Sequence, residues 1–320
     1  MKVLITGATG LVGSEIVRLC NHRHIAVNYL TTDRDKIVAA DGYTGFYWNP
    51  DLKQIDTECF NGVDAIINLA GANISKRWTK KYKKQILDSR VNALKTLAHG
   101  LSKIDTHTIR TLVSASAIGI YPDSQSTYYK EEETAVDNGF LGEVVPQWEE
   151  QADRFKELGL GVAKVRIGLV LSGKGGALPK MAKPIQYFVG AAFGSGRQWQ
   201  SWIHISDLAN IFMFLVEEEL SGIYNAVAPN PVCNAKLTKE IAKVLGRPLL
   251  LPNIPQSFLR LVLGEMSGLL FTSQRVSCKK MELAGYDFKY QNICRALSHI
   301  YNESEAFGRE DAQYKNEFVS

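Results

Sequence analysis

The sequence predicts an α/β protein in which a doubly wound parallel sheet is joined to a smaller C-terminal α/β domain. Two observations predict this fold class. Short apolar runs alternate with helical patterns through the first half of the chain, and the first of these runs leads directly into a glycine-rich turn. The 320 residues, 45% of them hydrophobic, are enough for about two domains with sizeable cores.

The alternation begins at the N-terminus. Residues 2–6 (KVLIT) form a short apolar run that is typical of a strand buried on both faces of a parallel sheet. Apolar residues then recur at helical spacing over 12–20, and a second apolar run at 25–30 completes a strand–helix–strand unit. Further strands are expected at 46–48, 65–69, 112–115 and 162–170, and further helices at 79–102 and 142–158.

The pattern changes after Arg166, where a glycine-rich, irregular stretch is followed by shorter mixed elements. One helix is expected to start with Asn234 as its cap and to stop at Gly246 and Pro248. We therefore expect a first domain over 1–165, a smaller domain over 166–301 that returns some elements to the first sheet, and a polar tail over 302–320.

Composition excludes several classes of protein. The 37 basic and 33 acidic residues leave a net charge of +4, too small for a protein defined by basic nucleic-acid binding. The five cysteines form no Cys-x-x-Cys pair, so neither a disulfide scaffold nor a zinc site is expected. No leader follows Met1, and the apolar stretch 211–216 is far shorter than a bilayer span. We expect a cytoplasmic protein that binds a small-molecule substrate, without nucleic acid, membrane or metal.

Three glycines lie in register between the first strand and the first helix. Gly7 and Gly10 permit a tight turn in which backbone N–H groups approach a pyrophosphate, and Gly13 permits close helix–strand packing. A plain turn would need only one glycine, so the spacing predicts a dinucleotide site. The residues expected there are Gly7, Thr9, Gly10, Leu11, Val12 and Gly13.

The end of the second strand decides between NADP and NAD, because it faces the adenosine ribose. Thr31, Thr32 and Arg34 could bind a 2′-phosphate, with Lys36 nearby, whereas Asp33 would favour the free 2′-hydroxyl of NAD. The balance favours NADP, with NAD as the alternative. The basic side chains could also simply coat the surface.

Several motifs together indicate a family. They are TGATGLVG at 6–13, NLAG at 68–71, SRV at 89–91, SASAIG at 114–119 and GSGRQW at 194–199. With them the chain resembles the extended short-chain dehydrogenase/reductases, and within these an atypical branch called epimerase family proteins, which are sugar-nucleotide epimerase-like. The resemblance covers about residues 1 to 301 and implies a Rossmann domain with NADP or NAD and a C-terminal domain that closes over a substrate.

The resemblance also implies further cofactor contacts. Asn49 would hold the adenine edge. The segment that passes behind the cofactor ribose would be Leu69, Ala70, Gly71 and Ala72, and the nicotinamide would be lined by Arg166, Ile167 and Leu169.

The usual catalytic pair of the superfamily, Tyr-x-x-x-Lys, is missing. Ser116 matches the serine that orients the substrate, but the stretch 144–148, where the pair is expected, reads VVPQW. None of the 13 tyrosines is followed by a lysine four residues later. The candidate substitutes are Tyr121, which could instead pack a loop, and His204, which could instead cap the helix that follows it.

Three residues are candidates for substrate contacts. Arg77 lies in a basic stretch, 76–84, which could bind an anion or form a solvated helix face. Arg197 could clamp an anion across the cleft, and Trp202 could form an aromatic wall or fill a core. Two hypotheses follow. The protein is an NADP-dependent epimerase or oxidoreductase for an anionic or sugar-like small molecule, or it is a non-catalytic dinucleotide-binding redox sensor or scaffold.

Overall fold

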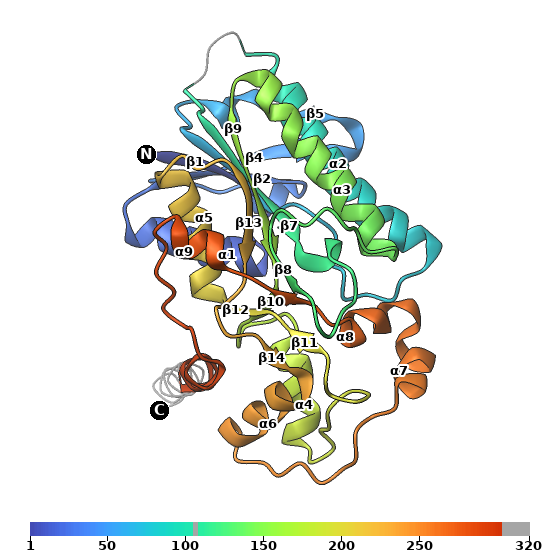
Figure 1. Cartoon of the computed structure of the whole chain (residues 1–320). Coiled ribbons are helices and arrows are strands. Elements are labelled where there is room, and N and C mark those ends of the chain that lie inside the picture. Colours follow the sequence, from blue (N-terminus) through green and yellow to red (C-terminus); the bar gives the residue numbers. More distant parts are fainter. Residues whose placement is uncertain (105–107, 303–320) are drawn as a thin grey trace.

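The computed structural model describes residues 1–104 and 108–302, and a large sheet forms its centre (Figure 1). The strand order is β13-β9-β7-β6-β1-β2-β4-β3, and all neighbours from β13 to β4 run parallel. The order reverses at β1, which lies between β2 and β6, so the predicted doubly wound sheet is confirmed. The strands are β1 (Lys2–Thr6), β2 (Ala26–Thr31), β3 (Ala39–Ala40), β4 (Tyr43–Asn49), β6 (Ala65–Asn68), β7 (Thr111–Ala117), β9 (Gly161–Ile167) and β13 (Gly222–Ala226), with β5 (Gln54–Ile55) antiparallel to β4.

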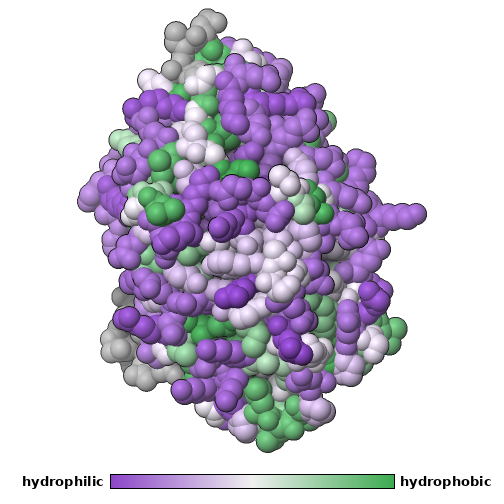
Figure 2. Space-filling view, in the orientation of Figure 1, coloured by the Kyte–Doolittle hydropathy of each residue, from purple (hydrophilic) through white to green (hydrophobic). Residues whose placement is uncertain are grey.

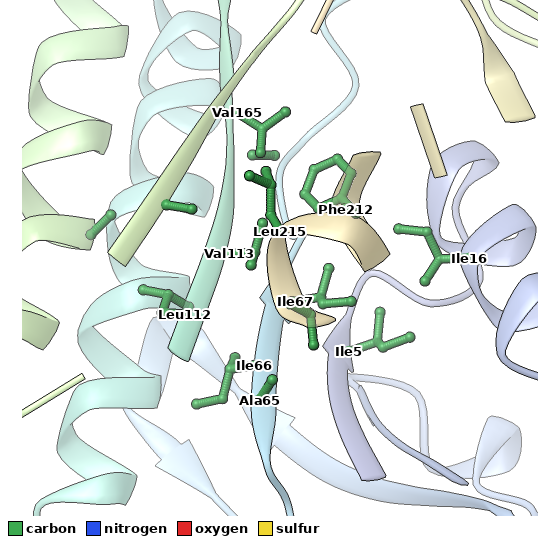
Figure 3. Packing of buried hydrophobic residues seen from close by; sticks show 14 of the residues in the cluster. Ile5, Ile16, Ala65, Ile66, Ile67, Leu112, Val113, Val165, Phe212 and Leu215 are labelled. Atoms are coloured by element: carbon green, nitrogen blue, oxygen red, sulfur yellow. The ribbon is translucent and has the colours of Figure 1, made fainter. Parts of the chain in front are cut away.

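Helices cover both faces of this sheet. One face carries α1 (Leu11–His22) and α5 (Ile205–Glu217), and the other carries α2 (Lys80–Leu101) and α3 (Phe140–Asp153) (Figure 1). The core between them is largely apolar because parallel strands are buried on both sides, and its buried polar groups include Ser116, Glu149 and Arg166. Figure 3 shows its centre, where side chains of α1 and α5 meet those of the strands: Ile16, Phe212 and Leu215 with Ile5, Ile67, Val113 and Val165.

A second, smaller unit lies beyond the carboxyl ends of the strands (Figure 1). Its own hydrophobic cluster includes Leu171, Trp202, Leu237 and Ile241. Its elements are β10 (Leu169–Leu171), α4 (Leu178–Gln186), β11 (Trp199–Gln200), β12 (Trp202–His204), β14 (Val232–Cys233), α6 (Asn234–Val244), α7 (Gln256–Leu263) and α8 (Gly268–Phe271). The chain returns to the large unit through α5, β13, β15 (Arg275–Val276), which pairs with β8 (Tyr128–Tyr129), and α9 (Lys279–Leu283).

The expected single strand at 162–170 is two strands. It breaks at Gly168, where a Cβ atom would lie 2.2 Å from the carbonyl oxygen of Ser201, and the chain passes there from the large sheet to the β10–β12 pair. The helix expected from Asn234 starts at that residue, but Cys233 is its N-cap. The Asn234 side chain instead accepts a hydrogen bond from the backbone N–H of Phe193, at 2.8 Å, and so connects the helix to the loop before it in the second unit.

Exposed apolar side chains gather at the end of the molecule farthest from the large sheet (Figure 2). The exposed apolar residues include Leu250 and Leu251, which lie in sequence between α6 and α7. The Cζ atom of Arg247 lies 5.0 Å from the centre of the Phe188 ring. Within residues 1–104 and 108–302, none of the helices combines the length and the apolar character that crossing a bilayer requires. Residues 303–320 of the expected tail lie outside the described part of the chain.

Candidate functional site

The glycine turn joins β1 to α1 with almost no free space. Gly7 has a φ of +71° and lies against the carbonyl of Leu69, where a Cβ atom would come within 3.1 Å. A Cβ atom on Gly13 would lie 2.2 Å from the Gly7 oxygen, so only glycine fits there. Gly10 is the N-cap of α1, and among the described residues no side chain caps this end. The first-turn N–H groups of α1 are thus available to an anion.

The hydroxyl of Thr6 ties this turn to the next strand. It donates to Asn68 Oδ1 at 2.8 Å and accepts from the backbone N–H groups of Leu69 and Ala70 at 3.0 and 3.1 Å. Asn68 in turn donates to Ser114 Oγ at 3.1 Å, which links the ends of β1, β6 and β7. Thr6 and Asn68 are not among the site residues predicted from sequence, although both lie in the quoted motifs. Their signal is a polar residue ending an otherwise apolar buried strand.

Helix α2 holds the predicted ribose segment from behind. The N–H of Ala72 donates to Ser89 Oγ at 2.9 Å, and Arg90 Nη1 donates to the Ala72 carbonyl at 3.2 Å. Gly71 makes room for this guanidinium, because a Cβ atom there would lie 3.0 Å from Arg90 Cζ. The segment therefore has a fixed backbone at the switch point of the sheet.

In the segment after β2, the acidic side chain of Asp33 is held by neighbouring groups, whereas the basic side chain of Arg34 is exposed. Asp33 caps a short 3₁₀ turn, Arg34–Lys36, and its other oxygen lies 3.3 Å from Lys36 Nζ. The Thr31 hydroxyl is bonded to the Asp33 backbone, and Thr32 is exposed. The exposed guanidinium of Arg34 lies over the ring of Tyr47, 3.9 Å from its centroid. Arg34 is thus oriented, whereas the carboxylate of Asp33 is already engaged.

Asn49 lies at the end of β4, as expected. Its Oδ1 accepts from the backbone N–H groups of Asp51 and Leu52 and so caps the next 3₁₀ turn. The oxygen of Asn49 is therefore occupied, and its amide Nδ2 group is the part that could contact an adenine. The loop with Gly175 and Gly176, which is not among the predicted cofactor segments, also borders the glycine turn between β1 and α1, because both glycines lie against the side chain of Leu11.

Ser116, Tyr121 and Arg166 meet in one buried network. Ser116 Oγ donates to Glu149 Oε1 at 2.6 Å, and Arg166 binds both Glu149 oxygens at 2.9 and 3.0 Å. Arg166 also donates to the Tyr121 hydroxyl at 3.0 Å, and this hydroxyl donates to Asn225 Oδ1 at 2.8 Å. All five side chains are buried. The pKa of Arg166 is raised mainly by Glu149, against the opposing effect of burial.

This network corrects two expectations. Tyr121 is fully buried and bonded to two partners, and burial raises its pKa, so it is a network residue and not a free proton donor. The guanidinium of Arg166 is directed to Glu149, so only its backbone could line a nicotinamide, together with the half-buried Ile167 and Leu169. Ser116 donates its proton to Glu149 and keeps only an acceptor position.

His204 occupies the helix-start position. Its Nδ1 accepts from the backbone N–H of Ser206 at 3.1 Å and caps α5, and its ring stacks on Tyr290 at 3.9 Å. Burial, with a smaller effect of nearby His299 and Lys289, lowers the pKa of His204 from 6.5 to about 3. The ring is 2% exposed and neutral near pH 7, which favours a capping role over acid/base chemistry.

We expect His204 to make folding stability depend on pH. Below about pH 6.5 the unfolded chain binds a proton that the folded chain does not, so stability falls as the pH drops toward 3. At pH 5, about 1.5 pH units below the ordinary histidine pKa, we expect the free energy of unfolding to be about 2 kcal/mol lower than at neutral pH. His204→Asn keeps a cap acceptor and should remove this part of the loss. Urea unfolding at pH 7.5 and at pH 5 measures this loss in both proteins. If the difference between the two pH values is the same in His204→Asn as in the unaltered protein, the assignment to His204 is wrong.

Of the three predicted substrate residues, one is buried and two are exposed. Trp202 is fully buried in the second cluster and its Nε1 donates to the Asn230 carbonyl at 2.9 Å, so the expected aromatic wall is corrected to a core residue. Arg197 is exposed. Arg77 is also exposed and lies near Gly264, in the segment after α7.

The basic stretch contacts the second unit. Lys83 pairs with Glu265 at 2.8 Å, which joins the start of α2 to the 3₁₀ turn Gly264–Ser267. The stretch therefore borders the space between the two units. Among residues 1–104 and 108–302, no three His, Cys, Asp or Glu side chains gather closely enough to hold a metal ion.

Comparison with known proteins identifies the family. Residues 3–140 match the NAD dependent epimerase/dehydratase family, and residues 254–300 match a domain of unknown function, DUF1731. An epimerase family protein of Staphylococcus aureus (strain NCTC 8325 / PS 47) is 35% identical over 307 residues, which cover 94% of this chain and 99% of that protein.

Solved structures agree with this comparison. The human epimerase family protein SDR39U1 (isoform 2) with NADPH is 28% identical, with a TM-score of 0.81 over 94% of this chain and 99% of that one. A nucleoside-diphosphate sugar epimerase from Corynebacterium glutamicum is 28% identical, with a TM-score of 0.74 over 99% of this chain and 68% of that one. The predicted resemblance is confirmed, and the chain belongs to the epimerase family proteins, an atypical branch of the short-chain dehydrogenase/reductases.

Proposed function

We propose that this protein binds NADP(H) in preference to NAD(H), at the glycine turn and the segment after β2. The arrangement of Arg34 carries the proposal. Its guanidinium lies over the ring of Tyr47 and is exposed just after the end of β2, where a 2′-phosphate is expected. Asp33, which would bind the 2′-hydroxyl of NAD, is engaged by the 3₁₀ turn and by Lys36. The NADPH in the human relative supports the same choice.

Arg34→Ala tests the cofactor preference. We expect the affinity for NADPH to fall about tenfold to a hundredfold, the value of a charge-assisted phosphate contact, and the affinity for NADH to stay almost unchanged. Isothermal titration with both cofactors measures this. Lys36→Ala is the matched control, because its charge is paired with Asp33. Equal losses for both cofactors, or tighter NADH binding by the unaltered protein, would refute the preference.

For the reaction, we propose an epimerase-like or oxidoreductase activity on an anionic or sugar-like small molecule. Family membership supports this class of reaction, and the exposed Arg77 and Arg197 provide positive charge for such a substrate. With bound NADP(H) supplying hydride transfer, the network of Ser116 and Glu149 would orient the backbone at the end of β7. The proton would have to come from a group other than Tyr121.

A second function has an observation in its favour. The hydroxyls of Ser116 and Tyr121 are both held by buried partners, which suits a non-catalytic dinucleotide-binding sensor or scaffold. Turnover separates the two functions. A panel of sugar nucleotides, aldehydes and ketones is assayed with NADPH and NADP, with Gly10→Asp as the control. Hydride transfer above this control supports the enzyme. Its absence in a protein that binds NADPH leaves the sensor or scaffold.

A further inference from the structure

The second unit carries an excess of positive charge that the rest of the chain lacks. Taken as residues 168–204 and 227–271, this unit holds nine basic and two acidic side chains, a net charge of +7. The other residues of the chain hold 28 basic and 31 acidic side chains, a net charge of −3. The net charge of +4 for the whole chain therefore conceals a strongly positive end, and such an asymmetry indicates an anionic partner.

Large apolar side chains are exposed on two neighbouring segments of this unit. The segments 187–194 and 247–254 lie side by side, because the N–H of Gly194 donates to the Ile254 carbonyl and the N–H of Ile254 donates to the Ala192 carbonyl, both at 2.8 Å. The chain between α6 and α7 runs along the end of the molecule farthest from the large sheet (Figure 1). We call the exposed apolar side chains of the two segments the apolar tip: Tyr187, Phe188, Val189, Leu249, Leu250 and Leu251.

The backbone at Phe188 is strained. Its φ is +62°, in the left-handed region that a bulky side chain rarely adopts, and it follows α4 at a position where many helices have glycine. The strain places no side chain in a core, since Phe188 is 43% exposed and Tyr187 beside it is 68% exposed. A strained segment that presents apolar side chains to water indicates a contact with a further molecule.

Cations border the apolar tip. Lys180 and Lys183 lie on α4, and the carbonyl of Lys183 accepts from the N–H of Tyr187. Lys243 and Arg247 lie at and just after the end of α6, which packs against α4. All four side chains are exposed, and within residues 1–104 and 108–302 none of the four is in an ion pair. The stretches 158–206 and 241–264 contain no Asp or Glu, so the positive charge around the tip is not compensated locally.

We propose that the second unit docks on an anionic membrane surface. The apolar tip would enter the boundary between headgroups and acyl chains, and the four cations, Lys180, Lys183, Lys243 and Arg247, would face the lipid phosphates. The contact is peripheral, so it requires no helix that crosses the bilayer. This inference departs from the expectation that no membrane is bound, because the net charge of the whole chain conceals the distribution between the two units.

Three other partners fit this surface less well. A second copy of the chain would bring two units of +7 together, which like-charge repulsion disfavours. A nucleic acid would use the cations and leave the apolar tip uncovered. An acidic protein remains, but three of the four cations are lysines, which are depleted at protein–protein interfaces and common where proteins meet anionic lipids.

Co-sedimentation of the full chain with vesicles tests the proposal. We expect vesicles of phosphatidylcholine and phosphatidylglycerol to be bound about tenfold or more tightly than vesicles of phosphatidylcholine alone, and added salt to weaken this binding. Leu250→Ser/Leu251→Ser should lower the affinity for the anionic vesicles about tenfold. Leu52→Ser/Leu283→Ser changes two exposed leucines of the large unit and is the matched control, which should bind as the unaltered protein does.

A second pair of variants tests the charge. Lys180→Gln/Lys183→Gln should also lower the affinity for the anionic vesicles about tenfold, whereas Lys95→Gln/Lys103→Gln, which changes two exposed cations of the large unit, should not. Thermal unfolding of each variant checks that it is folded.

Three results would overturn the proposal: no binding to either kind of vesicle, equal binding to both, or equal effects of the tip variants and their controls. A dimer that forms without lipid and is lost in Leu250→Ser/Leu251→Ser, in a protein that binds no vesicles, would show that a second copy covers the tip. Sedimentation velocity at several protein concentrations detects such a dimer, and this result too would refute membrane docking.

Discussion

Gly13→Ala is expected to reduce NADPH affinity by about 100-fold. The added Cβ atom would lie 2.2 Å from the Gly7 oxygen and 2.7 Å from Ala8 Cα, both of them backbone atoms that cannot rotate away. Helix α1 must therefore move from β1, which displaces the N–H groups that would receive the pyrophosphate. Titration of NADPH fluorescence measures the affinity, and thermal unfolding measures the accompanying loss of stability.

Two other glycines are controls for this substitution. Gly268 has no atom within 4 Å of a Cβ position, so Gly268→Ala should change neither binding nor stability appreciably. At Gly10 the nearest atom would be the Gly7 oxygen at 3.2 Å, so Gly10→Ala should have an intermediate effect. Undiminished NADPH binding by Gly13→Ala would mean that the cofactor does not use this turn.

The parts of the fold that could be predicted from sequence are those that depend on local pattern. The run 2–6, the glycines after it and the apolar stripe of α1 are neighbours in sequence, and hydrophobic periodicity describes each of them. The reversal of strand order at β1 follows from the same strand–helix–strand unit. The break at Gly168 could not be foreseen, because its cause is a carbonyl 33 residues later, at Ser201.

The side-chain chemistry depends on contacts distant in sequence. Tyr121 seemed a candidate because it follows Ser116 closely, yet its partner Asn225 is 104 residues away. Trp202 sits in a core that forms only when α4 and α6 come together. Conversely, Arg90 lay within a quoted motif without a role, because its contact with the ring of Trp148 is visible only once α3 is placed beside α2.

Glu149 accepts hydrogen bonds from Ser116 and from two nitrogens of the buried Arg166. Glu149→Ala is therefore expected to lower the free energy of unfolding by about 3–5 kcal/mol. The substitution leaves the buried Arg166 without its two charged hydrogen bonds and frees Ser116 Oγ. Lys164 Nζ lies 4.0 Å from Glu149 Oε2 and keeps its closer partner, Asp153, at 2.7 Å, so the loss centres on Arg166. Urea unfolding at neutral pH measures the difference.

The neighbouring residue gives the matched control. Glu150 is exposed and only loosely paired with Arg154, at 3.7 Å, so Glu150→Ala should change stability by no more than about 0.5 kcal/mol. The double variant Glu149→Leu/Arg166→Met removes both charges and should be more stable than Glu149→Ala alone, because no unpaired ion remains in the interior. If Glu149→Ala costs no more than Glu150→Ala, water reaches Arg166. The network would then be an open part of the site, and Ser116 and Tyr121 would again be candidates for catalysis.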